Sequence, residues 1–105
     1  MKNWNIEELT GYKPITTFYT DFSIADKFGV DAVKDTYTKA VDEWKNNYKY
    51  LTELVMVLNW KSIEHYENKN KELTYLYCDL YEELNNWCYE HFNEEEKEYF
   101  FKVTD

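Results

Sequence analysis

Two cysteines and two histidines are the residues of this sequence best suited to metal chemistry. Cys88 and His91 stand one helical turn apart, where a thiolate and an imidazole could share a zinc ion. A tetrahedral site needs two more ligands, and Cys78 and His65 are the remaining residues of these types. Neither belongs to a Cys-x-x-Cys or His-Glu-x-x-His pattern. We therefore predict no metal site and no cofactor.

Carboxylates are the second chemically capable group, and they are plentiful. Adjacent acids such as Asp42-Glu43 and Glu82-Glu83 could act as acid–base pairs only if an apolar pocket shifted their pKa values. Helical spacing places these pairs on polar faces. The sequence also has no glycine-rich phosphate loop and no Gly-x-Ser-x-Gly nucleophile motif. These features predict that the protein is not an enzyme.

Residues 23–33 resemble the core of a helix-turn-helix, with Ala25, Gly29 and Val30 at the usual small-residue, glycine and aliphatic positions. The helix that would read DNA begins with Asp31 and carries Asp35, and phosphates would repel both. The whole chain has a net charge of −9, and its 12 basic residues are all lysine. We predict no direct contact with nucleic acid.

Length and composition indicate one helical domain that spans residues 1–105. Hydrophobic residues make up 44% of the chain, whereas only two glycines and one proline are present. This scarcity of turn residues favours an all-α fold. We predict a small helical bundle of about three main helices, with short terminal helices and an extended N-terminal segment. No targeting signal or membrane-length apolar run is found, so we expect a cytoplasmic protein that does not contact a membrane.

In the first third of the chain, the residue pattern predicts short helices and an extended segment. A turn of helix ending near Gly11 is followed by an extended segment that includes residues 15–19. Asp21 is expected to cap a short helix ending at Phe28, with Gly29 as its terminator, and Asp31 to cap the next helix.

A regular apolar seam dominates the middle of the chain. Its steps of four and three residues are typical of a coiled coil, and they link Tyr37, Val41, Trp44, Tyr48, Leu51, Val55 and Leu58. A single helix over residues 31–67 would be about 55 Å long, but a domain of this size is about 35 Å across. We place a break at Asn46-Asn47, although the unbroken register favours one helix. Leu51, Val55 and Leu58 are predicted to be buried.

In the last third of the chain, the residue pattern predicts two helices. Asn70 is expected to cap the first, and Asn93 with Glu96 resembles a capping box for the second, whose apolar face is Tyr99, Phe100 and Val103. Cys78 and Cys88 lie about 15 Å apart along the first of these helices, so we predict unpaired thiols. Its predicted buried stripe comprises Leu73, Leu76, Tyr77, Leu80, Leu84, Trp87, Cys88 and His91.

Two surface features remain after the core is assigned. Residues 79–105 carry nine acids against two lysines, and the chain has 11 tyrosines, six phenylalanines and four tryptophans, more aromatic rings than a small core can hold. Trp60 and Tyr66 are expected to flank the apolar seam, and Tyr50, Tyr75 and Tyr89 to point away from it. Exposed tyrosine and tryptophan are enriched at protein interfaces, although tyrosines can also lie at the edge of a core with only the hydroxyl in water. The predicted partner-binding residues are Asp79, Glu82, Glu83, Glu90, Glu94, Glu95, Glu98, Tyr75 and Tyr89. The alternative is that the acidic face is only solvated.

Several runs of sequence resemble small uncharacterised acidic helical proteins encoded by phages and conjugative elements of low-GC Gram-positive bacteria. The runs are residues 21–29 (DFSIADKFG), 35–37 (DTY), 43–45 (EWK), 50–61 (YLTELVMVLNWK) and 99–105 (YFFKVTD). The resemblance implies a setting of host takeover or regulation of the mobile element. By analogy, small acidic proteins of that setting often inhibit host nucleases, sometimes by imitating DNA.

These observations give a leading hypothesis and an alternative. The first is a non-enzymatic protein-binding module that inhibits or modulates a host nucleic-acid enzyme through an acidic and aromatic, DNA-mimic-like surface. The alternative is a structural or assembly protein of the mobile element, as a homodimer or larger homo-oligomer.

Overall fold

The computed structural model describes residues 15–104, with side chains from Phe18 onward, and this part of the chain is entirely helical apart from short turns. The all-α prediction is therefore confirmed. The predictions for residues 1–14, a turn of helix and then an extended stretch, lie outside the described residues. The five helices are α2 (Ile15–Asp26), α3 (Val30–Trp44), α4 (Tyr48–Glu67), α5 (Lys71–His91) and α6 (Glu94–Thr104).

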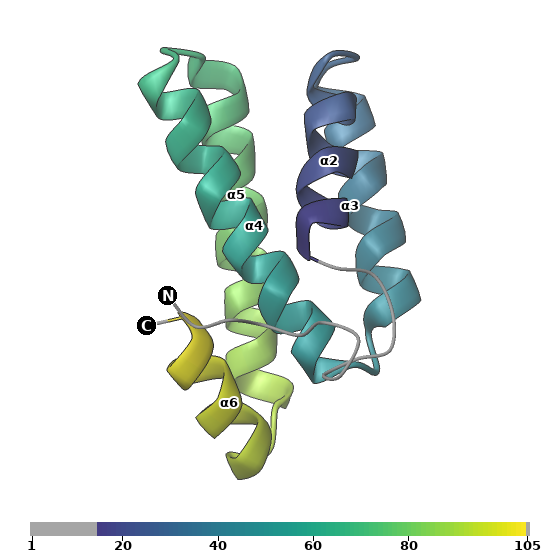
Figure 1. Cartoon of the computed structure of the whole chain (residues 1–105), viewed down its shortest axis with the longest axis vertical. Helices are drawn as coiled ribbons and strands as arrows, with labels where there is room; N and C mark the ends of the chain where they lie inside the picture. The colour runs from purple at the N-terminus through teal and green to yellow at the C-terminus, as the bar shows by residue number, and fades with distance from the viewer. Residues whose placement is uncertain (1–14, 105) are drawn as a thin grey trace.

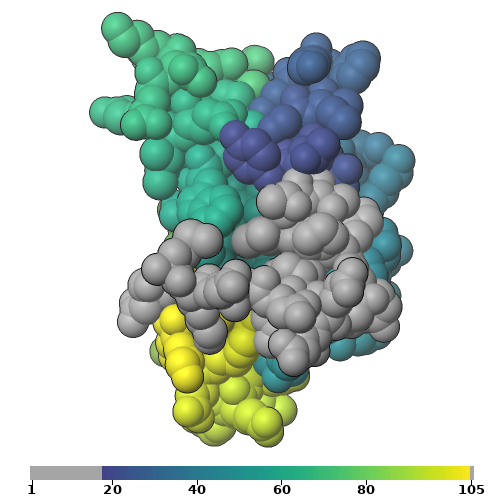
Figure 2. Space-filling model, viewed as in Figure 1, coloured from purple at the N-terminus to yellow at the C-terminus, as the bar shows by residue number. Residues whose placement is uncertain are grey.

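The helices form two helical hairpins and one short C-terminal helix. α4 and α5 make a long antiparallel pair, α2 and α3 make a second pair beside it, and α6 crosses the lower end (Figure 1). α4 is the central helix because it contacts each of the other four. On the face shown in Figure 2, the side chains of α2 and α4 close against each other in the upper half of the molecule.

The central position of α4 explains its unusual burial. Eleven of its 20 residues are buried, including every residue from Tyr50 to Val55, so neighbours surround its first half on all sides. The predicted burial of Leu51, Val55 and Leu58 is confirmed, since each is at most 1% exposed.

Tyr50 is fully buried, which corrects the expectation that it points away from the core. Its ring packs edge-on against Phe18 of α2 and Trp44 of α3, with centroids 5.5 and 4.4 Å away. Two flanking helices therefore enclose a face of α4 that the apolar seam alone left open.

The predicted break between α3 and α4 is confirmed. α3 ends at Trp44, and the side chain of Asn47 caps α4 by accepting a hydrogen bond from the Tyr50 amide at 3.1 Å. The seam keeps its register across the break, because the residues on both sides pack against one core. The longest dimension of the molecule, 37 Å, is too short for one continuous helix over this stretch.

The caps of α5 and α6 also agree with the sequence. The Asn70 side chain accepts from the Leu73 amide at 3.2 Å. Asn93 and Glu96 form a reciprocal capping box, in which each side chain accepts from the other residue's amide at 2.8 and 2.9 Å. Phe100 of the last helix is buried, and Tyr99 and Val103 are half-buried.

Most of the predicted stripe of α5 is buried, but its last turn is not. The buried members are Leu73, Leu76, Tyr77, Leu80, Leu84 and Cys88. Trp87 and His91 are exposed, which corrects the prediction. Their rings stack on each other at 4.4 Å, so each gains a ring contact without entering the core.

The start of α2 differs most from expectation. Residues 15–19 are helical rather than extended, and Asp21 lies inside the helix rather than at its cap. Phe18, Phe22 and Ala25 follow helical spacing and are at most 5% exposed, so burial of this face outweighs the low helix propensity of the three threonines in α2.

The turn between α2 and α3 depends on Gly29, whose φ of 106° is a backbone conformation that glycine adopts readily. α2 ends at Asp26, two residues before the predicted end at Phe28. Gly29 rather than Asp31 is the N-cap of α3. Asp31 lies in the first turn instead, where its carboxylate favours the helix dipole.

The burial of the apolar seam predicts how much stability is lost when one of its side chains is shortened. Leu58→Ala should lower the free energy of unfolding by about 2–5 kcal/mol, because it leaves a cavity at a fully buried position. Ile63→Ala is the matched control, since Ile63 lies on the same helix but is 48% exposed. Urea titrations of both variants test this, and equal losses would show that Leu58 is not part of the core.

Candidate functional site

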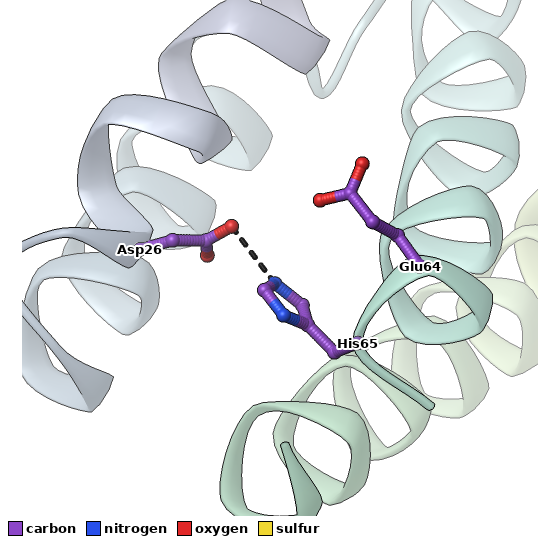
Figure 3. Close-up of side chains that lie close together, drawn as sticks. All are labelled: Asp26, Glu64 and His65. Atoms are coloured by element: carbon purple, nitrogen blue, oxygen red, sulfur yellow. Dashed lines mark hydrogen bonds and ion pairs between the residues drawn. The ribbon is translucent and has the colours of Figure 1, made fainter. Parts of the chain in front are cut away.

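A cluster of seven polar side chains joins α2, α4 and α5 at one end of the bundle. α2 supplies three of them at helical spacing, α4 supplies three more, and α5 supplies one. The members are Tyr19, Ser23, Asp26, Lys61, Glu64, His65 and Tyr77. Figure 3 shows Asp26, Glu64 and His65 approaching one another from α2 and α4.

The ammonium group of Lys61 lies at the centre of the cluster, and its side chain is only 1% exposed. Its Nζ lies 2.8 Å from Asp26 Oδ2 and 2.6 Å from Glu64 Oε2, and it donates to Ser23 Oγ at 3.1 Å. Burial disfavours the charged form, but the hydrogen bonds to Asp26 and Glu64 outweigh it, so the pKa of Lys61 lies above its ordinary value. This lysine is therefore a buried cation with a full set of partners.

Asp26 of α2 accepts bonds from both α4 and α5. Besides Lys61, its Oδ2 lies 2.8 Å from His65 Nε2, and its Oδ1 accepts from the Tyr77 hydroxyl at 2.5 Å. A carboxylate only accepts, so the proton of His65 is on Nε2. The rings of His65 and Tyr77 stack at 5.4 Å, which holds both donors in place.

Glu64 completes the cluster on its exposed side. It accepts from the Tyr19 hydroxyl, and the ammonium of Lys61 lies 4.8 Å from the centre of the Tyr19 ring. Burial raises the pKa of Glu64, but the hydrogen bonds from Lys61 and Tyr19, together with the nearby positive charge, outweigh burial, so the net pKa is lowered. Lys61 and Glu64 are thus both held in their charged forms.

Asp26, Glu64 and His65 are also close enough to hold a metal ion, because their ligand atoms lie within 4.8 Å of one another. Lys61 already supplies the positive charge that balances the same two carboxylates. The geometry thus favours an internal ion-pair network over a metal centre. The cysteines considered in the sequence do not join this trio, and both thiols are unpaired, as predicted.

The sequence contained one overlooked signal for this cluster. Continuing the seam beyond Leu58 in steps of four and three reaches Ser62 and His65, and both are buried. Polar residues at core positions require buried partners. The partner, Asp26, lies 39 residues away on a helix whose start was not foreseen, so spacing could not identify it.

Glu53 is a second buried charge, and it differs from the cluster. It is 0% exposed, and neither of its carboxylate oxygens has a hydrogen-bond partner among residues 15–104. Burial raises its pKa to about 8. Near neutral pH, Glu53 is therefore mainly protonated.

The predicted acidic residues are all on the surface. Asp79, Glu82 and Glu90 on α5 are exposed, as are Glu94, Glu95 and Glu98 on α6. None of them forms a salt bridge within the described part of the chain.

Glu83 is exposed too, but it leans toward α3. Burial and a hydrogen bond to Glu83 raise the pKa of the Tyr37 hydroxyl on α3. Glu83 consequently lies at the edge of the acidic surface, next to α3.

The predicted aromatic surface is partly confirmed. Tyr75 and Tyr89 are 67% and 55% exposed, and with Asp79 and Glu82 they occupy one face of α5 opposite its buried stripe. Tyr89 also contacts Phe101 and Lys97 of α6, with ring centroids 5.9 Å apart and the ammonium 5.1 Å away. Trp60 and Tyr66 are also exposed, but they belong to α4 and are therefore not part of this face of α5.

Compared with protein-family models, curated proteins and solved structures, the chain matches none. The resemblance to proteins of mobile elements therefore stays a prediction. Among the helices within residues 15–104, none combines the length and the apolar character needed to cross a membrane.

The ion-pair network predicts a large effect at Lys61. Lys61→Met should lower the free energy of unfolding by about 3–5 kcal/mol, because it removes a fully buried cation and leaves Asp26, only 12% exposed, without its counter-charge. Lys39→Met is the control, since the exposed Lys39–Asp35 pair at 3.0 Å should contribute about 0.5 kcal/mol or less. Thermal or urea unfolding measures both, and similar small losses would contradict a structural role for the network.

The burial of Glu53 predicts how the free energy of unfolding depends on pH. Its folded pKa of about 8 lies above the ordinary 4.5, so the folded state keeps a proton that the unfolded state releases. The stability that Glu53 contributes in its protonated form is fully present below the unfolded pKa of 4.5. As the pH rises from there toward about 8, the free energy of unfolding falls, because the unfolded state increasingly releases the proton that the folded state keeps. Glu53→Met should remove that fall and add about 1–3 kcal/mol at pH 8.

The control for Glu53 is Glu67→Met, at an exposed position on the same helix. It should keep the pH dependence of the unmodified protein. Urea unfolding from pH 5 to 8 measures the three proteins, and parallel curves for all of them would contradict the buried-carboxyl interpretation.

Proposed function

We propose that this protein is a non-enzymatic binding module whose acidic face on α5 and α6 contacts a basic surface of another protein, and that the partner is a nucleic-acid enzyme. The acidic face is defined as Asp79, Glu82, Glu83, Glu90, Glu94, Glu95 and Glu98, with Tyr75 and Tyr89 among them. The supporting observation is that its carboxylates are exposed and form no internal salt bridges within residues 15–104, whereas the buried Lys61 and the partly buried Asp26 are paired with each other.

Charge complementarity favours this class of partner. Residues 79–105 hold nine acids and two lysines, and one of those lysines, Lys97, lies over the Tyr89 ring rather than beside a carboxylate. The exposed carboxylates along α5 present a row of negative charges to a basic groove, as the phosphates of a DNA backbone do. Tyr75 and Tyr89 add aromatic contact area of the kind that anchors interfaces. The surface is suited to imitating DNA for an enzyme that binds DNA.

The test is a pair of charge-reversal variants. In the first, Asp79, Glu82, Glu90 and Glu95 are changed to Lys; Glu83 is spared because it contacts Tyr37. In the control, Asp31, Asp35, Glu43 and Glu67, which are exposed elsewhere, are changed to Lys. Each variant changes the net charge from −9 to −1. Circular dichroism checks that both remain folded.

The three proteins are then used for affinity capture from cells of a low-GC Gram-positive bacterium, followed by binding kinetics with each purified captured protein. We expect a DNA-binding enzyme that associates with wild type and the control, loses association with the first variant, and is inhibited by wild type. Association should slow steeply with salt, because long-range charge steers the encounter. Equal binding by both variants would contradict a role for the acidic face.

The assembly alternative gives a different result in the same samples. A homo-oligomer should be detected by light scattering of the purified chain alone. If the oligomer persists in both variants and no enzyme is captured, the aromatic surface rather than the acidic face is the interface, and the proposed inhibitor function is wrong.

A further inference from the structure

A groove between α3 and α5 opens beside the acidic face. Its volume is about 410 Å³, within the range of pockets that hold small ligands or side chains. The buried side chains of Tyr37 and Leu84 form its floor, and Val41 and Trp87 form its walls. The interior of the groove is therefore apolar and aromatic.

The rim of the groove is acidic. Asp42 and Glu83 lie on opposite helices, and Lys45 is the one basic residue among the described residues that line the groove. Lys45 Nζ is 3.6 Å from Asp42, but both side chains are more than half exposed, so this pair is weak. Glu83 lines the groove beside Tyr37, and its carboxylate lies near enough to help raise the pKa of the Tyr37 hydroxyl. The rim consequently presents a carboxylate held above an apolar floor.

Trp87 is fixed in a way that suits it to receive a cation. His91 stacks on one face of the indole at 4.4 Å with an interplanar angle of 12°, and its Nδ1 lies 2.9 Å from the Trp87 carbonyl oxygen. One face of the ring is covered by this contact, while Trp87 remains 37% exposed and lines the groove. A tryptophan face is the strongest aromatic partner for a cation.

We propose that this groove is the anchor site of the acidic face, and that it receives an arginine side chain from the basic partner. The aliphatic part of an arginine fits the apolar floor, its guanidinium can stack on Trp87, and its planar fork can bond to the Glu83 carboxylate. An anionic group would be repelled by the rim, and a purely apolar one would desolvate two carboxylates without compensation. This inference rests on the proposed function and specifies its central contact.

The experiment uses the full chain labelled with ¹⁵N and a short peptide with one arginine between leucine and alanine residues. A second peptide carries citrulline, the neutral isostere, in place of arginine. Titration by NMR should shift the Trp87 indole N–H and the backbone amides of Val41 and Leu84. The citrulline peptide should bind about tenfold more weakly, since it lacks the charge that meets the rim.

Two double variants with the same loss of charge separate the groove from the rest of the acidic face. D42N/E83Q alters the rim, and D79N/E82Q alters exposed positions that do not line the groove. We expect the first to weaken arginine-peptide binding about tenfold and the second about twofold or less. Melting temperatures of both variants establish that the fold is retained.

Three outcomes would overturn the anchor site. These are equal weakening by the two double variants, equal binding of the arginine and citrulline peptides, or no shift at the Trp87 indole. Each leaves the proposed function standing if the capture experiment succeeds, because its reversed residues lie outside the groove. Conversely, peptide binding in the groove without charge-dependent capture would retain the anchor site and reject the wider acidic interface.

Discussion

The position of α2 in the bundle depends on the buried ammonium group of Lys61. A charge that is only 1% exposed must be matched by partners, and α2 brings two of them, Asp26 and Ser23. This requirement fixes how α2 is rotated about its axis. Phe18, Phe22 and Ala25 face the core while Tyr19, Ser23 and Asp26 face α4, so one helix buries an apolar stripe and an adjacent polar one. Burial of the apolar stripe alone would tolerate several rotations, but hydrogen bonds to Lys61 tolerate few.

The central location of α4 has a second consequence, the segregation of charge. Because α4 is enclosed along its first half, it has few exposed positions there, and Glu53 is buried with no hydrogen-bond partner among residues 15–104. The outer helices carry most of the remaining acids, and α5 and α6 have one face free of other helices. Repulsion among these carboxylates is tolerated because water and salt screen exposed charges. The acidic face is thus compatible with folding and needs no compensating bases from within the chain.

The sequence predicted local features well and long-range ones poorly. The break at Asn47, the cap at Asn70 and the Asn93–Glu96 box depend on a few neighbouring residues, and each is found where it was expected. Leu51, Val55 and Leu58 were predicted because helical spacing reports a buried face directly. Tyr50 was misplaced because a second buried face of α4 exists only once α2 and α3 are docked. The Lys61 cluster was missed for the same reason, since nothing near Lys61 in the sequence points to Asp26.

The Lys61 cluster and the acidic face differ in how many of their charged groups remain available to bind another molecule. In the buried cluster, Lys61 and Glu64 are each shifted toward the charged form. General acid–base catalysis near neutral pH needs the opposite, a group whose two protonation states are close in free energy. Their hydrogen-bonding capacity is also used within the cluster, so a ligand would have to break strong bonds to enter. Apart from Glu83, which lies beside Tyr37, the carboxylates of the acidic face make no such bonds within the described chain. In the proposed interaction, a basic partner would displace only the water around these carboxylates, whereas a ligand of the Lys61 cluster would have to break ion pairs. The proposal therefore assigns recognition to α5 and α6 rather than to the Lys61 cluster.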